Sequence, residues 1–409
     1  MAAAAAPAPA RLLSHGQAAL MLALLLGLQP LATDLMLPAL PALALDLHAT
    51  MAPVQLTMSA LMLAFGLAQM VWGPLADRLG RRPVLVMGLA LYLLASAGAA
   101  LASDVAGVVA WRAVQGAGMS AAVVCARAMI RDLYEPHEGA MVMARAITGM
   151  TVIIILSPLV GGVLVDRWGW RAAIWAMAAG AAAVSALVAI RLPETIRQKR
   201  PEATRPGPLL RQLGRMLAHP AFRAWALLVA CSYGGIFIFL AGTGFVLIRV
   251  LGMAPAVAGV VMSSVSIAYM AGTLLCRRWL PQQGLARSVQ RGAWLTAASV
   301  LAMLALAATD ARSPWAVMAP IWLFTLGHGV HMPCGQAGAV GPFPQAAGLA
   351  SALAGLATAL SAFAIGLVMG RVMDAPSVRP FALGMATCGA LTALVAFTLV
   401  RRHGDAVQA

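Results

Sequence analysis

The chain has 409 residues, of which 62% are hydrophobic and only 10% are charged. A soluble globular protein is about half apolar and about a quarter charged. A water-facing fold cannot hide this much apolar surface, so the composition excludes a soluble protein and indicates that lipid is the solvent. The formal net charge of +15 does not predict nucleic-acid binding, because the basic residues lie in short loops between apolar runs and no basic face is interleaved with stacking aromatic residues.

Apolar runs of about 20 residues, long enough to span a bilayer, recur along the whole chain. The sequence predicts twelve spanning helices, at 17–40, 53–76, 82–102, 105–130, 141–165, 170–191, 221–247, 256–280, 288–308, 313–337, 345–370 and 377–400. They fall into six plus six around one polar stretch that contains the only lysine, Lys199, together with many Arg and Pro residues. We therefore expect an all-α membrane protein with twelve transmembrane helices in two six-helix bundles.

The distribution of positive charge predicts the orientation. If the N-terminus, the even-to-odd loops, the central polar stretch and the C-terminus share one side, that side carries about 21 of the 28 Lys and Arg residues and the other side about six. An excess of Lys and Arg marks the cytoplasm, so both termini are expected inside. The expected domains are a cytoplasmic N-terminal tail (1–16), an N-terminal bundle (17–191), a cytoplasmic linker (192–220), a C-terminal bundle (221–400) and a cytoplasmic tail (401–409).

Chemistry typical of soluble enzymes is missing from the sequence. It contains no Walker-type phosphate loop, no nucleophile elbow and no HExxH motif, so we expect neither an enzyme nor ATP-driven transport by this chain alone. Five cysteines are scattered through the apolar runs, and none forms a CxxC motif or a cluster with histidine. The sequence therefore predicts no disulfide framework and no metal site, and we interpret the cysteines as small core residues.

Asp34 is the one acidic residue of thirteen that lies well inside an apolar run, LQPLATDLMLPAL. A carboxylate in the membrane is costly unless it is paired or neutral, so an ionisable residue at this depth indicates a functional site. Removal from water favours its neutral form, which would let it exchange a proton near neutral pH. The alternative is a structural carboxylate that snorkels outward, because Asp34 lies in the outer half of the first helix.

Arg112 is the basic counterpart, about two turns into the fourth helix, with Gln115 on the same face. An arginine cannot lose its proton here and must pair with a carboxylate, backbone carbonyls or water. Its expected partner is Asp34, and the alternative is a polar patch in the same half of the chain. Arg127, nearer the expected cytoplasmic end, is interpreted as structural.

Two further groups are candidates for a proton or substrate site. His328 and His331 lie three residues apart on one face of the tenth helix and titrate near neutrality. They either carry protons or bind substrate, or they are hydrogen-bonded core residues, which is the interpretation that we favour. Tyr233 and Phe237 in the seventh helix either line an aromatic pocket wall or pack as ordinary core residues.

The stretch 73–85 (GPLADRLGRRPVL) is a short, densely charged loop between the second and third helices. Glycine and proline residues punctuate it as turns. It resembles the signature of the major facilitator superfamily at this position, with matches at Gly73, Leu75, Asp77, Arg78, Gly80, Arg81 and Arg82. We call this stretch the latch loop.

Other motifs resemble the same family. WRAVQGAG resembles its helix-4 motif, with matches at Arg112, Gln115, Gly116 and Gly118. SPLVGG in the fifth helix resembles the antiporter motif at Pro158, Gly161 and Gly162, although Ser157 and Ile153 stand where that motif has glycine. Longer matches, among them LATDLMLPALPAL, ARAMIRDLY, WGWR, LPET and PFPQAAGLASALAG, look like the Bcr/CflA group of drug exporters.

The resemblance implies two pseudo-symmetric six-helix bundles around a central cavity near the midplane. It also implies a proton-coupled antiporter of the bacterial inner membrane that exports small amphipathic drugs or metabolites as a monomer, with the proton gradient as energy source and no cofactor. A carboxylate like Asp34 and an arginine like Arg112 would serve protonation and substrate recognition. The latch loop would close the cytoplasmic side, with topological anchoring as the alternative. A symporter that imports a small metabolite and a non-transporting, substrate-sensing membrane protein remain open.

Overall fold

The computed structural model describes residues 14–196, 199, 206–373 and 377–404, and every regular element among them is helical. The predicted N-terminal tail therefore lies outside the described residues up to residue 13, and the predicted C-terminal tail from residue 405 onward. The helices are α1 His15–Asp34, η1 Leu37–Ala39, α2 Leu40–Asp46, α3 Met51–Leu79, α4 Arg81–Leu101, α5 Val105–Leu133, α6 Pro136–Trp168, α7 Trp170–Arg191, α8 Pro206–Ala218, α9 Pro220–Gly244, η3 Phe245–Val250, α10 Pro255–Thr309, α11 Pro314–Val340, η4 Pro344–Ala346, α12 Ala347–Val372, α13 Arg379–Val395, η5 Ala396–Val400 and α14 Arg401–His403.

The twelve predicted spans are confirmed. Ten helical runs of the described chain are long and apolar enough to cross a membrane. One of them, α10, has 55 residues and contains two spans, because Gly284 (φ 72°) adopts a backbone conformation that interrupts the helix. The 27-residue α11, with two internal prolines, completes the set of twelve.

The first span is not one continuous helix. The prediction was a single helix over 17–40, but α1 ends at Asp34 and the chain restarts as η1 and then α2. Pro38 and Pro41 each lie in the first turn of one of these restarts. Proline is tolerated there, because the N–H groups of a first helical turn have no partner within the helix. The break therefore leaves carbonyl groups at the end of α1 that other side chains must satisfy in a membrane.

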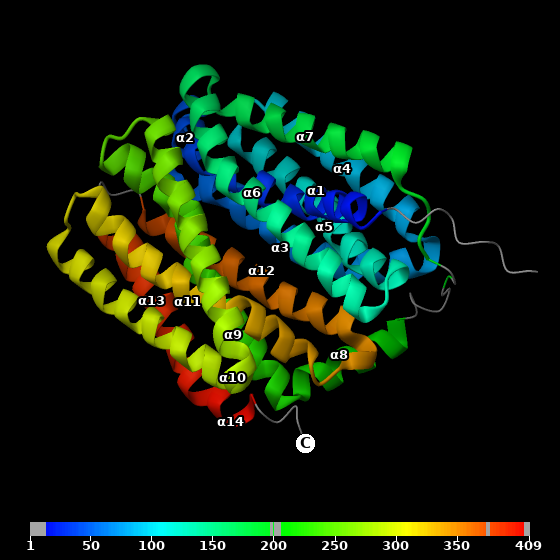
Figure 1. Ribbon diagram of the computed structural model, residues 1–409. Helices are drawn as coiled ribbons and strands as arrows, with labels where there is room; N and C mark the ends of the chain where they lie inside the picture. Colours follow the sequence, from blue (N-terminus) through cyan, green and yellow to red (C-terminus); the bar gives the residue numbers. More distant parts are fainter. Residues whose placement is uncertain (1–13, 197–198, 200–205, 374–376, 405–409) are drawn as a thin grey trace, which may run out of the picture.

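The helices form two bundles that lie side by side, α1–α7 in the N-terminal half and α9–α13 in the C-terminal half (Figure 1). The bundles contact each other along α3 with α12 and along α6 with α10. At one end of the molecule, η1 and α2 also lie against α9, η3 and α10. We call this the η1 end.

Small residues set how closely the helices approach. Gly116 on α5 faces the backbone of Leu61 on α3, and a Cβ at this position would overlap the Leu61 carbonyl oxygen. Membrane helices commonly use glycine at such contacts, because dispersion between closely packed backbones replaces the hydrophobic effect as the source of association. The α3–α5 contact of the N-terminal bundle therefore depends on the absence of a side chain at Gly116.

Replacing Gly116 with alanine tests this contact. Gly116→Ala should lower the stability of the purified protein by about 1 to 3 kcal/mol, because the added methyl group forces two backbones apart. The matched control is Gly214→Ala, in the middle of α8, where no atom lies within 4 Å of the added Cβ. The control should leave stability unchanged or raise it by up to about 1 kcal/mol through helix propensity. Unfolding in detergent measures both, and equal effects would contradict the packing interpretation.

Candidate functional site

Asp34 is the last residue of α1 and is only 8% exposed. The hydroxyl group of Thr33 donates a hydrogen bond to Asp34 Oδ1 at 2.7 Å. The carboxylate is therefore turned into the protein, and this position does not fit the alternative of a side chain that snorkels outward. Among the described residues, no Lys, Arg or His forms an ion pair with it.

Arg112 on α5 is fully buried and is held by neutral groups. Its Nη2 donates to the carbonyl oxygen of Ala32 at 2.8 Å, and its Nη1 donates to Gln115 Oε1 at 2.5 Å. The Gln115 amide in turn donates to Ser96 Oγ at 2.7 Å. The expected ion pair between Arg112 and Asp34 was therefore wrong for this conformation, and the alternative of carbonyls and a polar patch describes the contacts.

The helix break explains this partner. Met36 N–H donates to the carbonyl of Thr33 instead of the carbonyl of Ala32, because the backbone turns more tightly where α1 ends. The Ala32 carbonyl is thus free to accept from Arg112. Arg112 Nε is buried without a partner in the described part of the chain. The site therefore contains a buried cation with an unused donor, and its carbonyl partner Ala32 lies two residues before Asp34 in the chain.

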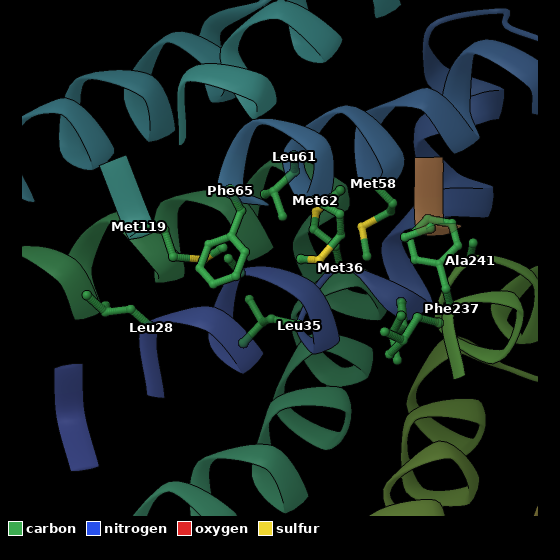
Figure 2. Close-up of a cluster of buried hydrophobic side chains, with 14 of the residues drawn as sticks. Leu28, Leu35, Met36, Met58, Leu61, Met62, Phe65, Met119, Phe237 and Ala241 are labelled. Atoms are coloured by element: carbon green, nitrogen blue, oxygen red, sulfur yellow. The ribbon is translucent and has the colours of Figure 1, made fainter. Parts of the chain in front are cut away.

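Buried side chains of both bundles meet in one cluster in this conformation. Figure 2 shows a cluster of buried residues, and those that it labels come from α1, from the segment between α1 and η1, and from α3, α5 and α9. Its labelled members are Leu28, Leu35, Met36, Met58, Leu61, Met62, Phe65, Met119, Phe237 and Ala241. Both bundles contribute to it, so the cluster closes the centre between them. Methionine contributes four of these side chains, and its flexible thioether fills irregular space and repacks readily.

Tyr233 and Phe237 on α9 both reach this centre. The Tyr233 hydroxyl donates to the sulfur of Met62 on α3 at 3.3 Å, a contact between the two bundles. Phe237 is fully buried in the cluster of Figure 2. The structure therefore places Tyr233 at a contact between the two bundles and packs Phe237 as a core residue.

His328 and His331 on α11 lie in a separate group inside the C-terminal bundle. Both Nδ1 atoms face the hydroxyl of Ser232 on α9, at 2.9 Å from His328 and 3.4 Å from His331. The ring of Tyr269 packs against that of His328 with centroids 5.7 Å apart. The contacts of the two histidines are therefore with Ser232 and Tyr269 and not with Asp34 or Arg112, an arrangement that favours the hydrogen-bonded core interpretation.

The prediction of a loop over 73–85 was wrong, because α3 continues to Leu79 and α4 starts at Arg81; the latch loop is a turn at Gly80 built around Arg81. Gly80, with φ 115°, turns the chain between α3 and α4 in a conformation that favours glycine. Arg81 then forms ion pairs with Asp77 at 2.6 Å and with Asp132, at the end of α5, at 2.9 Å. Its side chain is nearly buried, so the two carboxylates neutralise a charge that water reaches poorly.

Glu194 is a member of this group that was not predicted as a site residue. Its carboxylate accepts hydrogen bonds from the backbone N–H groups of Arg81 at 2.9 Å and Arg82 at 3.2 Å. These are unsatisfied donors at the start of α4, and an anion is favourable at a helix N-terminus. The side chain of Arg82 donates to the carbonyl of Ala189. These partners of Arg81 and Arg82 all belong to the N-terminal half of the chain. Gly73 and Arg78 lie on α3, which leads into the turn at Gly80.

The helix-5 motif lies where the halves meet at the η1 end. A Cβ on Gly161 would overlap the carbonyl of Leu35, and one on Gly162 would press on the backbone at Pro255, the first residue of α10. On the opposite side of this contact, Gly259 faces the carbonyl of Pro158. The motif therefore lets α6 pack closely on both the broken first span and the other bundle.

Comparison with known proteins identifies the family. Residues 22–366 match the model described as Major Facilitator Superfamily. Multidrug resistance protein D of Escherichia coli (strain K12) is 30% identical over 334 residues, which cover 82% of this chain and 83% of that protein. A bicyclomycin resistance protein homolog of Haemophilus influenzae is 24% identical over 395 residues, which cover 94% of this chain and 96% of that protein.

The fold agrees with solved structures. The crystal structure of a D-xylose-proton symporter has a TM-score of 0.72 at 16% sequence identity and covers 93% of this chain and 97% of that chain. At this identity the likeness shows the fold alone. The relatives named for multidrug and bicyclomycin resistance agree with the resemblance to the Bcr/CflA group. Since the family match covers most of its length, the chain is a multi-pass membrane transporter and not an enzyme, and it belongs to the Major Facilitator Superfamily.

Proposed function

We propose that this transporter is a proton-coupled antiporter that exports small amphipathic drugs or metabolites across the bacterial inner membrane, as a monomer with both termini in the cytoplasm. The observation that carries the proposal is the buried Asp34 carboxylate, which has only the Thr33 hydroxyl as hydrogen-bond donor and no cationic partner among the described residues. The names of the relatives, which refer to multidrug and bicyclomycin resistance, support the class of substrate. The excess of Lys and Arg on the side of the termini supports the orientation.

The proposed cycle begins with Asp34 accepting a proton from outside. A neutral carboxyl group is much less costly in the membrane than a carboxylate, so protonation changes the relative stability of the two access states. Substrate then enters from the cytoplasm or inner leaflet, and release of the proton inside favours the return. The membrane potential contributes about 2.3 kcal/mol per charge per 100 mV. No cofactor takes part in these steps.

Arg112 has a second part in this proposal. Its guanidinium group is already held by the Ala32 carbonyl and Gln115, yet its Nε has no partner in the described chain. A buried cation of this kind favours a nearby anion, so Arg112 would stabilise the charged state of Asp34. The two side chains form no ion pair in the present conformation. The substrate would bind in the methionine-rich centre of Figure 2, where the Tyr233–Met62 contact between the halves separates to admit it.

His328 and His331 would then form part of the neutral wall of the C-terminal bundle, hydrogen-bonded through Ser232. Phe237 would contribute apolar surface to the same side of the centre. Flexible thioethers and aromatic rings adapt to ligands of different shape, which suits a broad range of amphipathic substrates.

Transport in inside-out vesicles separates export from its alternatives. With an acidic lumen, an antiporter that exports drug should accumulate a fluorescent amphipathic drug in the lumen. A proton symporter that imports a metabolite should empty the lumen of substrate under the same gradient. A sensing protein should bind the drug without any gradient-dependent flux. Release of drug from an acidified lumen would overturn the proposal.

Asp34→Asn should abolish proton-driven drug accumulation, because the amide cannot take up and release a proton. The matched control is Asp46→Asn, a carboxylate on the same first span that is exposed and accepts hydrogen bonds from Trp170 and Arg171. Proton and drug fluxes in proteoliposomes measure both variants. Drug-dependent proton flux at the wild-type level in Asp34→Asn would show that another group carries the proton.

Asp77→Asn tests the latch loop. We propose that Asp77, Arg78 and Arg81 hold the cytoplasmic side closed in the outward-facing state. Loss of the Asp77 charge should slow turnover by about fivefold, which corresponds to about 1 kcal/mol, the upper end for a partly exposed ion pair. The half-saturating drug concentration should stay near its wild-type value, because the loop does not contact the centre.

The control for this variant is Asp166→Asn, an exposed carboxylate near the end of α6. It removes the same charge far from the latch loop and should leave turnover unchanged. If Asp77→Asn transports at the wild-type rate, the loop serves only as an anchor for topology.

A further inference from the structure

The stretch predicted as a plain linker contains a helix, α8, whose two sides differ strongly. Met216 is fully buried against the core of the C-terminal bundle, and Leu213 packs partly against the same core. Leu210 and Leu217 are instead 66% and 53% exposed. They are seven residues apart and therefore lie on one face of the helix. Two large apolar side chains thus project from α8 beside its contact with the protein.

The remaining face of α8 is basic. Arg211 and Arg215 are both exposed and lie one turn apart. The helix contains no acidic residue, and neither arginine forms an ion pair within the part of the chain that the structure describes. An amphipathic helix with leucines on one face and arginines on the other is typical of segments that lie in the plane of a membrane surface.

The position of α8 in the fold fits that plane. Only His219 separates its last residue from Pro220, the first residue of the spanning helix α9. Figure 1 shows α8 crosswise to the spanning helices at one end of the C-terminal bundle, near α14. The exposed side chains of Arg401 and Arg402 on α14 add positive charge at the same end. The exposed leucines therefore lie on a helix at the end of the bundle where the spanning helix α9 begins.

We infer that α8 is an interfacial helix that binds anionic phospholipid. Leu210 and Leu217 would insert at the edge of the acyl chains, and Arg211 and Arg215 would bind the phosphate groups above them. Lipid is the occupant that the structure favours, because the helix ends one residue before a membrane span and its charge is complementary to an acidic leaflet. The inference does not depend on the direction of transport or on its coupling to protons.

The charge part is tested by titrating phosphatidylglycerol onto the delipidated full-length protein in detergent and following bound lipid by native mass spectrometry. The double variant Arg211→Gln/Arg215→Gln should bind its tightest lipid about twentyfold more weakly, from about fivefold for each arginine. The matched control Arg371→Gln/Arg379→Gln removes two exposed arginines from the other end of the same bundle and should bind that lipid normally. Unchanged affinity in the α8 variant would overturn the inference.

The insertion part uses an environment-sensitive fluorophore on a cysteine introduced at Leu217 or, as control, at the exposed Gln212 on another face of α8. In vesicles of phosphatidylcholine with phosphatidylglycerol, a nitroxide on the lipid acyl chain should quench the fluorophore at position 217 and spare that at 212. Quenching of position 217 by aqueous iodide would place this face in water. Protection from both quenchers would mean that a second copy or another protein covers it, and either result would overturn the inference.

Discussion

The contact between Arg112 and the Ala32 carbonyl is the interaction on which the centre of the molecule depends. A backbone carbonyl in a bilayer has no water to bind, so every break in a spanning helix needs a donor from elsewhere in the protein. The first span breaks after Asp34, and the guanidinium group from α5 supplies that donor at 2.8 Å. The same contact satisfies one donor of a buried arginine, whose other oxygen partner is the side chain of Gln115. The break in the first span and the buried Arg112 therefore stabilise each other, because each satisfies a polar group of the other.

This arrangement brings the two intramembrane charges to the same part of the first span without pairing them. Arg112 is bound by the carbonyl two residues before Asp34, while the Asp34 carboxylate is bound by the hydroxyl of Thr33. A tight ion pair would hold the aspartate permanently charged, because a neighbouring cation favours the carboxylate. A separated pair lets the aspartate change its charge at moderate cost, which is what the proposed exchange of protons requires.

Patterns of composition predicted the parts of this fold that depend on the lipid environment. They could not predict contacts between segments that are distant in the sequence. The spans followed from length and apolarity, and Asp34 and Arg112 stood out because charge is costly in an apolar run. The partner of Arg112 could not be predicted, since it depends on where α1 ends. Glu194 was missed as part of the latch loop because its partner Arg81 lies 113 residues away. The helix α8 was not predicted, because its arginines and prolines led us to interpret the whole stretch 192–220 as a polar linker.

The short segment after Asp34 connects the proposed proton site to the seal between the halves. Leu35 is the next residue, and its carbonyl lies against Gly161 of the helix-5 motif, while the carbonyl of Leu37 lies against Gly244 of the other bundle. In both contacts a backbone carbonyl packs directly on a glycine. No flexible side chain lies between them to absorb a displacement, so a small movement of the segment would produce either a clash or a gap. A change of charge at Asp34 that shifts the end of α1 would therefore act directly on the η1 end. On this physical ground, the glycines at 161 and 244 should matter for coupling even though neither touches a proton or a substrate.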